Sequence, residues 1–226
     1  MTIKLALKNM VPLLFSYLFV GIAFGLLVVE TGYPPYYAPL CAIFIYAGSM
    51  QIVLISLLQS HMPLWLLAAM TFFVNARHIF YGFGFLQEFK AMGWKYPIMV
   101  FGITDETYSI FCSMKLPKGV NRDNVRFYIT VFAYFLWLIA CTIGAYFGDI
   151  LPSSLNGIDY SAIAFFITVV ANQWEQLPTR TPIYIGFFTG IFGLLLTQSD
   201  KFLLPAFCFS AALLIIFQKN IKKVTQ

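Results

Sequence analysis

Residues Leu64–Leu86 read LWLLAAMTFFVNARHIFYGFGFL, an apolar stretch with Asn75, Arg77 and His78 near its middle. The stretch is long enough to cross the roughly 30 Å of bilayer hydrocarbon, which takes about 20 helical residues. Arg77 then lies too deep to reach either headgroup layer comfortably. An Arg at this depth costs at least about 2.5 to 3.5 kcal/mol on insertion scales. We therefore expect a compensating partner elsewhere in the chain.

The composition of the whole chain also indicates a membrane protein. Of 226 residues, 60% are hydrophobic and only 10% are charged, and the mean hydropathy is +0.81. Soluble proteins carry about 25% charged residues, which this chain lacks for a hydrated surface. The sequence predicts one integral membrane domain, residues 1–226, with an all-α bundle of seven or eight spans, some of them broken at mid-membrane. The predicted spans are Pro12–Val29, Ala38–Leu58, Leu64–Leu86, Pro97–Met114, Phe127–Phe147, Tyr160–Ala171, Pro182–Thr197 and Phe202–Phe217.

Basic residues in the connections predict the orientation of these spans, because cytoplasmic loops retain Lys and Arg. They gather before the first span, in the central loop and at the end of the chain: Lys4, Lys8, Lys115, Lys118, Arg122, Arg126, Lys219, Lys222 and Lys223. We expect both termini and the central loop to face the cytoplasm. Lys90 and Lys95 disagree, since a full crossing by Leu64–Leu86 places them outside. A re-entrant Leu64–Leu86 would instead move the central loop outside, which violates the rule more.

Two acidic residues at matching depth are the expected partners of Arg77. The stretch PIMVFGITDETYSIFCSM, Pro97–Met114, has Asp105 and Glu106 at its middle. Adjacent residues of a helix project about 100° apart, so both carboxylates cannot face the same guanidinium. One carboxylate is expected to neutralise Arg77, and the other to titrate or to bind. The sequence does not show which of the two carboxylates has which role. His78 is a third group that can carry a proton, and Asn75 lies on the same helix face.

Polar residues also interrupt the second predicted span. The stretch YAGSMQI, residues 46–52, holds Gly48, Ser49 and Gln51 at mid-depth. A glycine beside polar residues suggests a broken helix whose free N–H groups hold a carboxylate. Hydrogen bonding between helices explains the same residues equally well. A similar cluster, Asn172, Gln173 and Glu175, is better explained as a helix end at the membrane interface.

Other patterns predict packing rather than chemistry. GIAFG (21–25), GAYFG (144–148) and GFFTG (186–190) each place two glycines one turn apart, which lets helix backbones approach closely. Cys41, Cys112, Cys141 and Cys208 lie in apolar segments without metal-binding spacing. We expect no metal and no cofactor.

Enzymatic and nucleic-acid functions are disfavoured. The chain has no H-E-x-x-H or G-x-S-x-G motif, and its two histidines are His61 and His78. A membrane-embedded hydrolase is therefore not expected. The net charge of +5 belongs to the loops rather than to a basic stripe with interleaved aromatics, so no nucleic-acid partner is expected.

Four motifs together resemble a known family. GIAFG (21–25), GSMQ (48–51), VNARHIFYG (74–82) and TDETY (104–108), in this order, are similar to those of the AzlC family of branched-chain amino acid permeases. The resemblance implies export of leucine, isoleucine and valine, with methionine as a further candidate, across a bacterial plasma membrane. It also implies a small hydrophobic membrane subunit of the AzlD type as partner. The residues that match the family motifs are Gly48, Gln51, Asn75, Arg77, His78, Asp105 and Glu106.

The polar residues suit such a cargo, because an amino acid is a zwitterion with one carboxylate and one ammonium group. Arg77 or the break at Gly48 is suited to the carboxylate, and Asp105 or Glu106 to the ammonium group. Since the cargo is neutral, membrane potential alone cannot drive it outward, and we expect inward proton movement to drive export. The alternative is a membrane assembly subunit whose polar residues bind a partner. Replacing Asp105 with Asn discriminates between them, since a scaffold would still support transport.

Overall fold

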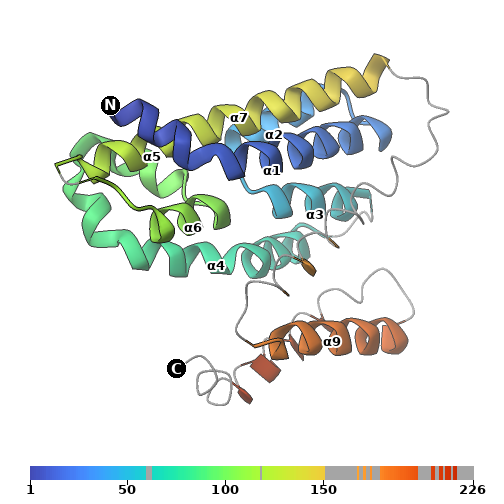
Figure 1. Cartoon of the computed structure of the whole chain (residues 1–226). Coiled ribbons are helices and arrows are strands. Elements are labelled where there is room, and N and C mark those ends of the chain that lie inside the picture. Colours follow the sequence, from blue (N-terminus) through green and yellow to red (C-terminus); the bar gives the residue numbers. More distant parts are fainter. Residues whose placement is uncertain are drawn as a thin grey trace. The chain divides into compact units, whose positions relative to one another are not determined.

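The computed structural model describes residues 1–59, 63–117, 119–150 and 179–197, together with isolated residues between 167 and 217. Every regular element in these residues is a helix (Figure 1). The chain divides into two compact units, Met1–Ala162 and Ile163–Gln226. In the described residues, three helices of the first unit are long and apolar enough to cross a membrane: α1 (Thr2–Glu30), α4 (Leu64–Ala91) and α7 (Arg122–Ile150). The predicted all-α membrane fold is confirmed.

The second unit is described mainly by α9, which spans Thr181–Thr197. This helix coincides with the predicted span that begins at Pro182. The predicted spans Tyr160–Ala171 and Phe202–Phe217 lie largely outside the described residues, as do Asn172, Gln173 and Glu175.

Helices α1 and α7 pack in parallel along the first unit (Figure 1). A Cβ atom added to Gly21 would lie 2.6 Å from Ala140 Cβ, and one added to Gly144 would lie 2.7 Å from Ile22 Cα. The successive contacts run in the same direction along both helices, so the two helices begin at the same end of the unit. Glycines at this interface let the backbones approach within van der Waals distance, as GIAFG and GAYFG predict.

The predicted span Ala38–Leu58 is two helices, α2 (Tyr37–Phe44) and α3 (Gly48–Gln59). Helix α2 starts at the end of the unit where α1 finishes and runs inward along α7, where Tyr134 donates a hydrogen bond to the Ile43 carbonyl. Helix α3 begins beside Trp137 and runs back along α4 toward Leu64 (Figure 1). The segment therefore returns to the end from which it entered.

The predicted span Pro97–Met114 folds back in the same way. After a short 3-10 turn, η1 (Gly93–Lys95), helix α5 (Tyr96–Phe101) runs inward beside the start of α7. Lys95, the last residue of η1, meets Asn124 of α7 at 2.5 Å, and Met99 of α5 then meets Thr130 of α7 at 3.6 Å.

Helix α6 (Asp105–Ser113) then runs parallel to α4, back toward the end where α4 finishes. Tyr108 stacks on Tyr81 with ring centroids 4.5 Å apart, and further along α6 Phe111 meets Phe89 at 6.3 Å. The start of α7 lies at this same end, since Arg122 donates a hydrogen bond to the Phe111 carbonyl.

These two hairpins correct the predicted topology, in which both segments cross the membrane. Because α5 and α6 enter and leave at one end, Lys90 and Lys95 lie at the same end as the central loop and not opposite it. Apart from Arg77, every described Lys and Arg of the first unit lies at this end, which we call the basic end: Lys4, Lys8, Lys90, Lys95, Lys115, Arg122 and Arg126. The disagreement that these two lysines created is thus removed.

The first 113 residues also contain an inverted repeat that sequence similarity does not reveal. Residues 1–59 consist of a crossing helix followed by a hairpin that enters from the end opposite the basic end. Residues 64–113 consist of a crossing helix in the opposite direction, followed by a hairpin that enters from the basic end. Inverted repeats of this kind are common in secondary transporters, whose binding sites lie at the repeat interface near mid-membrane.

Candidate functional site

The tips of the two hairpins meet in the middle of the first unit. One tip is the break between α2 and α3, residues 45–47, and the other is the break between α5 and α6, residues 102–104. The rings of Tyr46 and Phe101 stack with centroids 5.8 Å apart, which joins the two tips directly. Irregular backbone at this depth is tolerated only where protein covers it or where it lines a cavity.

The second break forms because its sequence supplies both a glycine and a helix cap. A Cβ atom at Gly102 would overlap the side chain of Thr130, so only glycine fits against α7 there. Thr104 caps α6: its Oγ1 accepts from the Thr107 N–H at 3.3 Å, and Thr107 Oγ1 accepts from the Thr104 N–H at 2.8 Å. This capping box satisfies N–H groups that lipid could not.

The first break depends on aromatic packing instead. Tyr46 has a φ of 45°, in the left-handed region that bulky residues rarely adopt. Its ring lies between Phe101 and Tyr134, the latter at 5.1 Å, and these contacts hold the strained residue in place. Helix α3 then begins with the hydrogen bond from the Gln51 N–H to the Ala47 carbonyl. The predicted break beside Gly48 is therefore present in the structure.

Arg77 connects the two hairpins. Its Nη2 lies 2.8 Å from Asp105 Oδ2 at the start of α6 and donates a 2.5 Å hydrogen bond to Ser49 Oγ at the start of α3. The side chains of Arg77 and Asp105 are 33% and 35% exposed. Arg77 Nε and Asp105 Oδ1 are buried atoms without a hydrogen-bond partner among the described residues. Each group therefore retains hydrogen-bonding capacity for a ligand.

Glu106 faces a different set of groups. Its Oε2 accepts a 3.2 Å hydrogen bond from the Tyr17 hydroxyl of α1, which also lies 2.8 Å from Thr104 Oγ1. In the described part of the chain, no Lys, Arg or His lies within ion-pair distance of Glu106. The expectation that one carboxylate neutralises Arg77 and the other does not is confirmed, and Asp105 is the one that pairs.

Gln51 and Gly48 face Trp137 of α7. The Trp137 Nε1–H donates a 2.9 Å hydrogen bond to Gln51 Oε1, and Gln51 is fully buried. A Cβ atom at Gly48 would lie 3.0 Å from the Trp137 ring. Hydrogen bonding between helices thus accounts for Gln51 Oε1, whereas Gln51 Nε2 is buried without a hydrogen-bond partner among the described residues. Close approach of the Trp137 ring accounts for Gly48.

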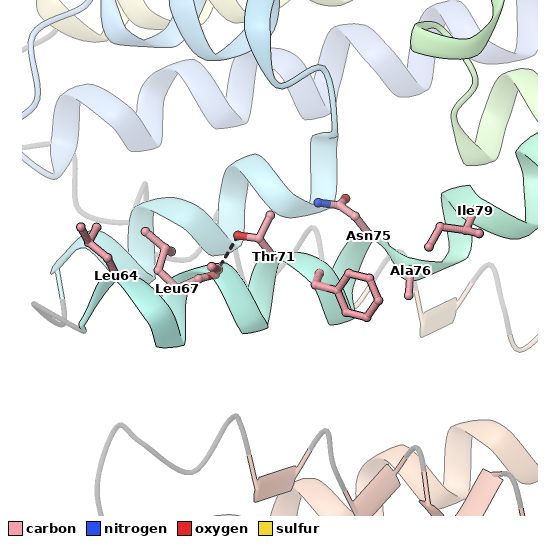
Figure 2. Close-up of a pocket in the computed structure, with 8 residues that line it drawn as sticks. Leu64, Leu67, Thr71, Asn75, Ala76 and Ile79 are labelled. Carbon is pink, nitrogen blue, oxygen red and sulfur yellow. Dashed lines mark hydrogen bonds between the residues drawn. The ribbon is translucent and has the colours of Figure 1, made fainter.

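Among the described residues, Asn75 and His78 make no hydrogen bond or ion pair with Arg77, Asp105 or Ser49. His78 Nδ1 lies 3.2 Å from the Asn75 carbonyl oxygen, one turn back on the same helix. The Asn75 side chain helps to line a groove of about 600 Å³ along α4. Figure 2 shows Leu64, Leu67, Thr71 and Asn75 following one another along one side of the helix. The groove is lined by Leu64, Leu67, Ala68, Thr71, Phe72, Asn75, Ala76 and Ile79.

In the described residues, no three His, Cys, Asp or Glu side chains gather closely enough to hold a metal ion. The polar groups present are instead a guanidinium, two carboxylates, hydroxyls and an amide. Groups of this kind are suited to charged or zwitterionic organic ligands.

Comparison with known proteins adds a family to this geometry. The family model described as "AzlC protein" matches residues 12–151. The chain belongs to the AzlC family. The match covers both crossing helices and both hairpins from Pro12 onward, and therefore includes every residue of the site described above.

Several AzlC-family relatives match nearly the whole chain. A Bacillus subtilis (strain 168) protein named "Branched-chain amino acid transport protein AzlC" is 28% identical over 94% of this chain and 84% of its own length. A Helicobacter pylori (strain J99) membrane protein is 28% identical over 97% of this chain and 96% of its own length. The Escherichia coli (strain K12) "Inner membrane protein YgaZ" is 28% identical over 81% of this chain and 79% of its own length. No solved structure gave a significant match.

Three residues of the AzlC-family site were not predicted from the sequence. Thr104 had a signal, because a Thr-x-x-Thr pair after a glycine can indicate a helix start. No sequence signal distinguished Tyr17 or Trp137. The chain is 19% aromatic, and neither residue belongs to a local motif that sets it apart from the other aromatic residues. Only the fold brings Tyr17 to Glu106 and Trp137 to Gln51.

Proposed function

We propose that this chain is a secondary transporter that exports branched-chain amino acids from a bacterial cell. In this proposal it is the large subunit of a two-component permease, its partner is a small hydrophobic subunit of the AzlD type, and inward proton movement drives export. The name of the Bacillus subtilis relative supports the substrate class. The observation that carries the proposal is the position of Arg77, which contacts the first turn of the helix after each hairpin tip, at Ser49 and at Asp105.

The contacts of Arg77 suit a zwitterion. The free Nε of Arg77 and the first-turn N–H groups of α3 can donate to a carboxylate, while the free Oδ1 of Asp105 can accept from an ammonium group. Binding at this point would hold both hairpins through one small molecule.

The distribution of basic residues supports a cytoplasmic basic end. Because Lys and Arg are retained on the cytoplasmic side, the N-terminus and the central loop would face the cytoplasm, and we expect the C-terminus to do so as well. We further propose that both compact units together form one transporter domain, residues 1–226, in the plasma membrane.

Efflux of radiolabelled leucine tests this function. Cells that contain the chain and its small partner are loaded with labelled leucine, and the label remaining inside is followed over time. We expect faster loss of label than in cells without the chain, slower loss when a protonophore collapses the proton gradient, and no acceleration by Arg77→Gln.

Two results would contradict the proposal. Equal efflux with and without the chain, for leucine, isoleucine, valine and methionine alike, would remove the substrate class. Full transport by an Asp105→Asn variant would favour the assembly-subunit alternative, because a scaffold does not need the ionised pair.

A further inference from the structure

The two carboxylates at the start of α6 have partners of different chemistry. Asp105 faces the Arg77 guanidinium at 2.8 Å, which has only donors and does not lose its proton in proteins. Such a partner satisfies an ionised carboxylate, whereas a protonated one would place a proton against a cation. The geometry therefore assigns Asp105 to Arg77 as its counter-ion.

Glu106 faces hydroxyl groups, which both donate and accept hydrogen bonds. When Glu106 is ionised, Tyr17 donates to its Oε2 across 3.2 Å and can accept from Thr104 Oγ1 across 2.8 Å. When Glu106 is protonated, it can donate to Tyr17, which then donates to Thr104. The Thr104 hydroxyl can in turn point to Thr107 Oγ1 at 3.4 Å. Both protonation states are thus satisfied without movement of any heavy atom.

No described cation competes for Glu106. The titratable groups near it are Tyr17 of α1, Tyr46 of the first hairpin tip, Tyr81 of α4 and its own neighbour Asp105. The guanidinium of Arg77 is engaged by Asp105. From α7, Arg126 lies over the ring of Phe111, toward the other end of α6, and pairs with Glu88 and Asp123.

We propose that Glu106 takes up and releases the coupling proton, and that Tyr17 is the positioning residue that accommodates both of its states. The proposal rests on the transport function proposed above. It gives the two adjacent carboxylates different roles: Asp105 takes part in substrate binding, and Glu106 takes part in proton coupling. Because Tyr17 lies on α1 and Glu106 on α6, each proton transfer changes the direction of hydrogen bonds between the two repeats.

Vesicles that contain the full chain and its small partner provide the test, with radiolabelled leucine as probe. Two measurements are compared: net transport driven by a pH gradient, and exchange of labelled for unlabelled leucine without any gradient. We expect Glu106→Gln to lose gradient-driven transport and still exchange leucine, because the amide resembles the protonated carboxylic acid in shape. Asp105→Asn should lose both, because it disrupts the ion pair with Arg77.

The possible results separate the inference from the function. If Glu106→Gln keeps gradient-driven transport at the wild-type level, or loses exchange together with it while still reaching the membrane, the inference is overturned and the transport function stands. If the wild-type chain moves no branched-chain amino acid in either measurement, the proposed function itself fails.

A second variant keeps the inference testable if Glu106→Gln does not accumulate in the membrane. Tyr17→Phe retains the ring that packs edge-on against Trp137 at 5.2 Å and removes only the hydroxyl. We expect this variant to shift the pH dependence of leucine transport, whereas Tyr36→Phe, at an exposed tyrosine in the loop after α1, should leave it unchanged. A pH dependence identical to that of the wild type in Tyr17→Phe would overturn the role of Tyr17 and of the hydroxyl network.

Discussion

Arg77 is a charged residue at mid-membrane whose cost is offset by partners from two other helices. One guanidinium nitrogen reaches both Ser49 and Asp105, so removal of either charge would leave the other without a counter-ion in a poorly hydrated place. Removing one member of a buried ion pair typically destabilises a protein far more than replacing both members. The pair thus has a stability signature that can be measured apart from transport.

A double-mutant cycle at this pair tests the argument. We expect Arg77→Gln and Asp105→Asn each to lower the free energy of unfolding by about 3 kcal/mol, and the double variant to recover a large part of that loss. Folded protein in detergent, followed by thermal melting monitored by circular dichroism, gives the four values. Additive losses in the double variant would show that the two charges do not interact.

At the residue scale, the sequence predicts those contacts that electrostatics alone determines. A lone Arg and two carboxylates at matching depth in lipid have few other partners, and the pairing of Arg77 with one of the two follows from that scarcity. Only the structure identifies Asp105 as that one. The role of Glu106 needed the fold, because the direction in which each of two adjacent residues points depends on where α6 begins. A helix that starts at Asp105 rather than at Pro97 changes what surrounds both side chains.

At the scale of elements, the α1–α7 interface is the closest backbone contact that the glycine motifs produce. Because a Cβ atom on Gly144 would lie 2.7 Å from the Ile22 Cα atom, a substitution there must push two long helices apart. Dispersion contacts along the whole interface would weaken as a consequence.

Alanine substitutions at glycines therefore have opposite outcomes at two positions. We expect Gly144→Ala to lower the melting temperature of the purified chain and the amount that reaches the membrane. Gly82→Ala, on the face of α4 where no described atom lies within 4 Å of an added Cβ, is the matched control. It should be neutral or should stabilise the helix by up to about 1 kcal/mol, the usual advantage of Ala over Gly.

Comparing the two variants tests whether the α1–α7 interface requires glycine. Equal melting temperatures for Gly144→Ala and Gly82→Ala would show that the α1–α7 contact does not require glycine. A loss only at Gly144 would show that the interface, rather than general helix propensity, explains the spacing of the two glycines within GAYFG.

The hairpins could not be predicted from hydropathy, and the reason lies in what hydropathy measures. Eighteen or more apolar residues indicate that a segment is long enough to cross, but not whether it continues or turns back. Pro97–Met114 meets the length criterion, yet Gly102 and the Thr104 cap divide it into two short helices. The basic residues Lys90 and Lys95 carried the correct signal, since their position is consistent only with a segment that returns.

At the scale of the whole molecule, the topology of the first unit predicts which loops share a side of the membrane. Single cysteines are introduced at Lys90, Lys115 and Tyr36, all exposed positions, in a chain whose four native cysteines are replaced. A membrane-impermeant thiol reagent is then applied to intact cells or to inverted vesicles.

We expect Lys90→Cys and Lys115→Cys to react only in inverted vesicles and Tyr36→Cys only in intact cells. The reason is that α5 and α6 return to the basic end, which the positive-inside rule assigns to the cytoplasm. Reaction of Lys90→Cys and Lys115→Cys from opposite sides would contradict the hairpin and restore a single crossing by Pro97–Met114.

The meeting of the two hairpin tips near mid-membrane has an electrical consequence. Each hairpin occupies about half of the hydrocarbon thickness, so Glu106 lies near the middle of the transmembrane voltage drop. Moving one elementary charge across the whole bilayer involves electrical work of about 2.3 kcal/mol per 100 mV. A proton that reaches Glu106 from either side crosses only about half of the voltage drop and involves about half of this work. Voltage would then act on proton entry and on proton release in nearly equal measure, and neither step would carry the whole electrical work of the cycle.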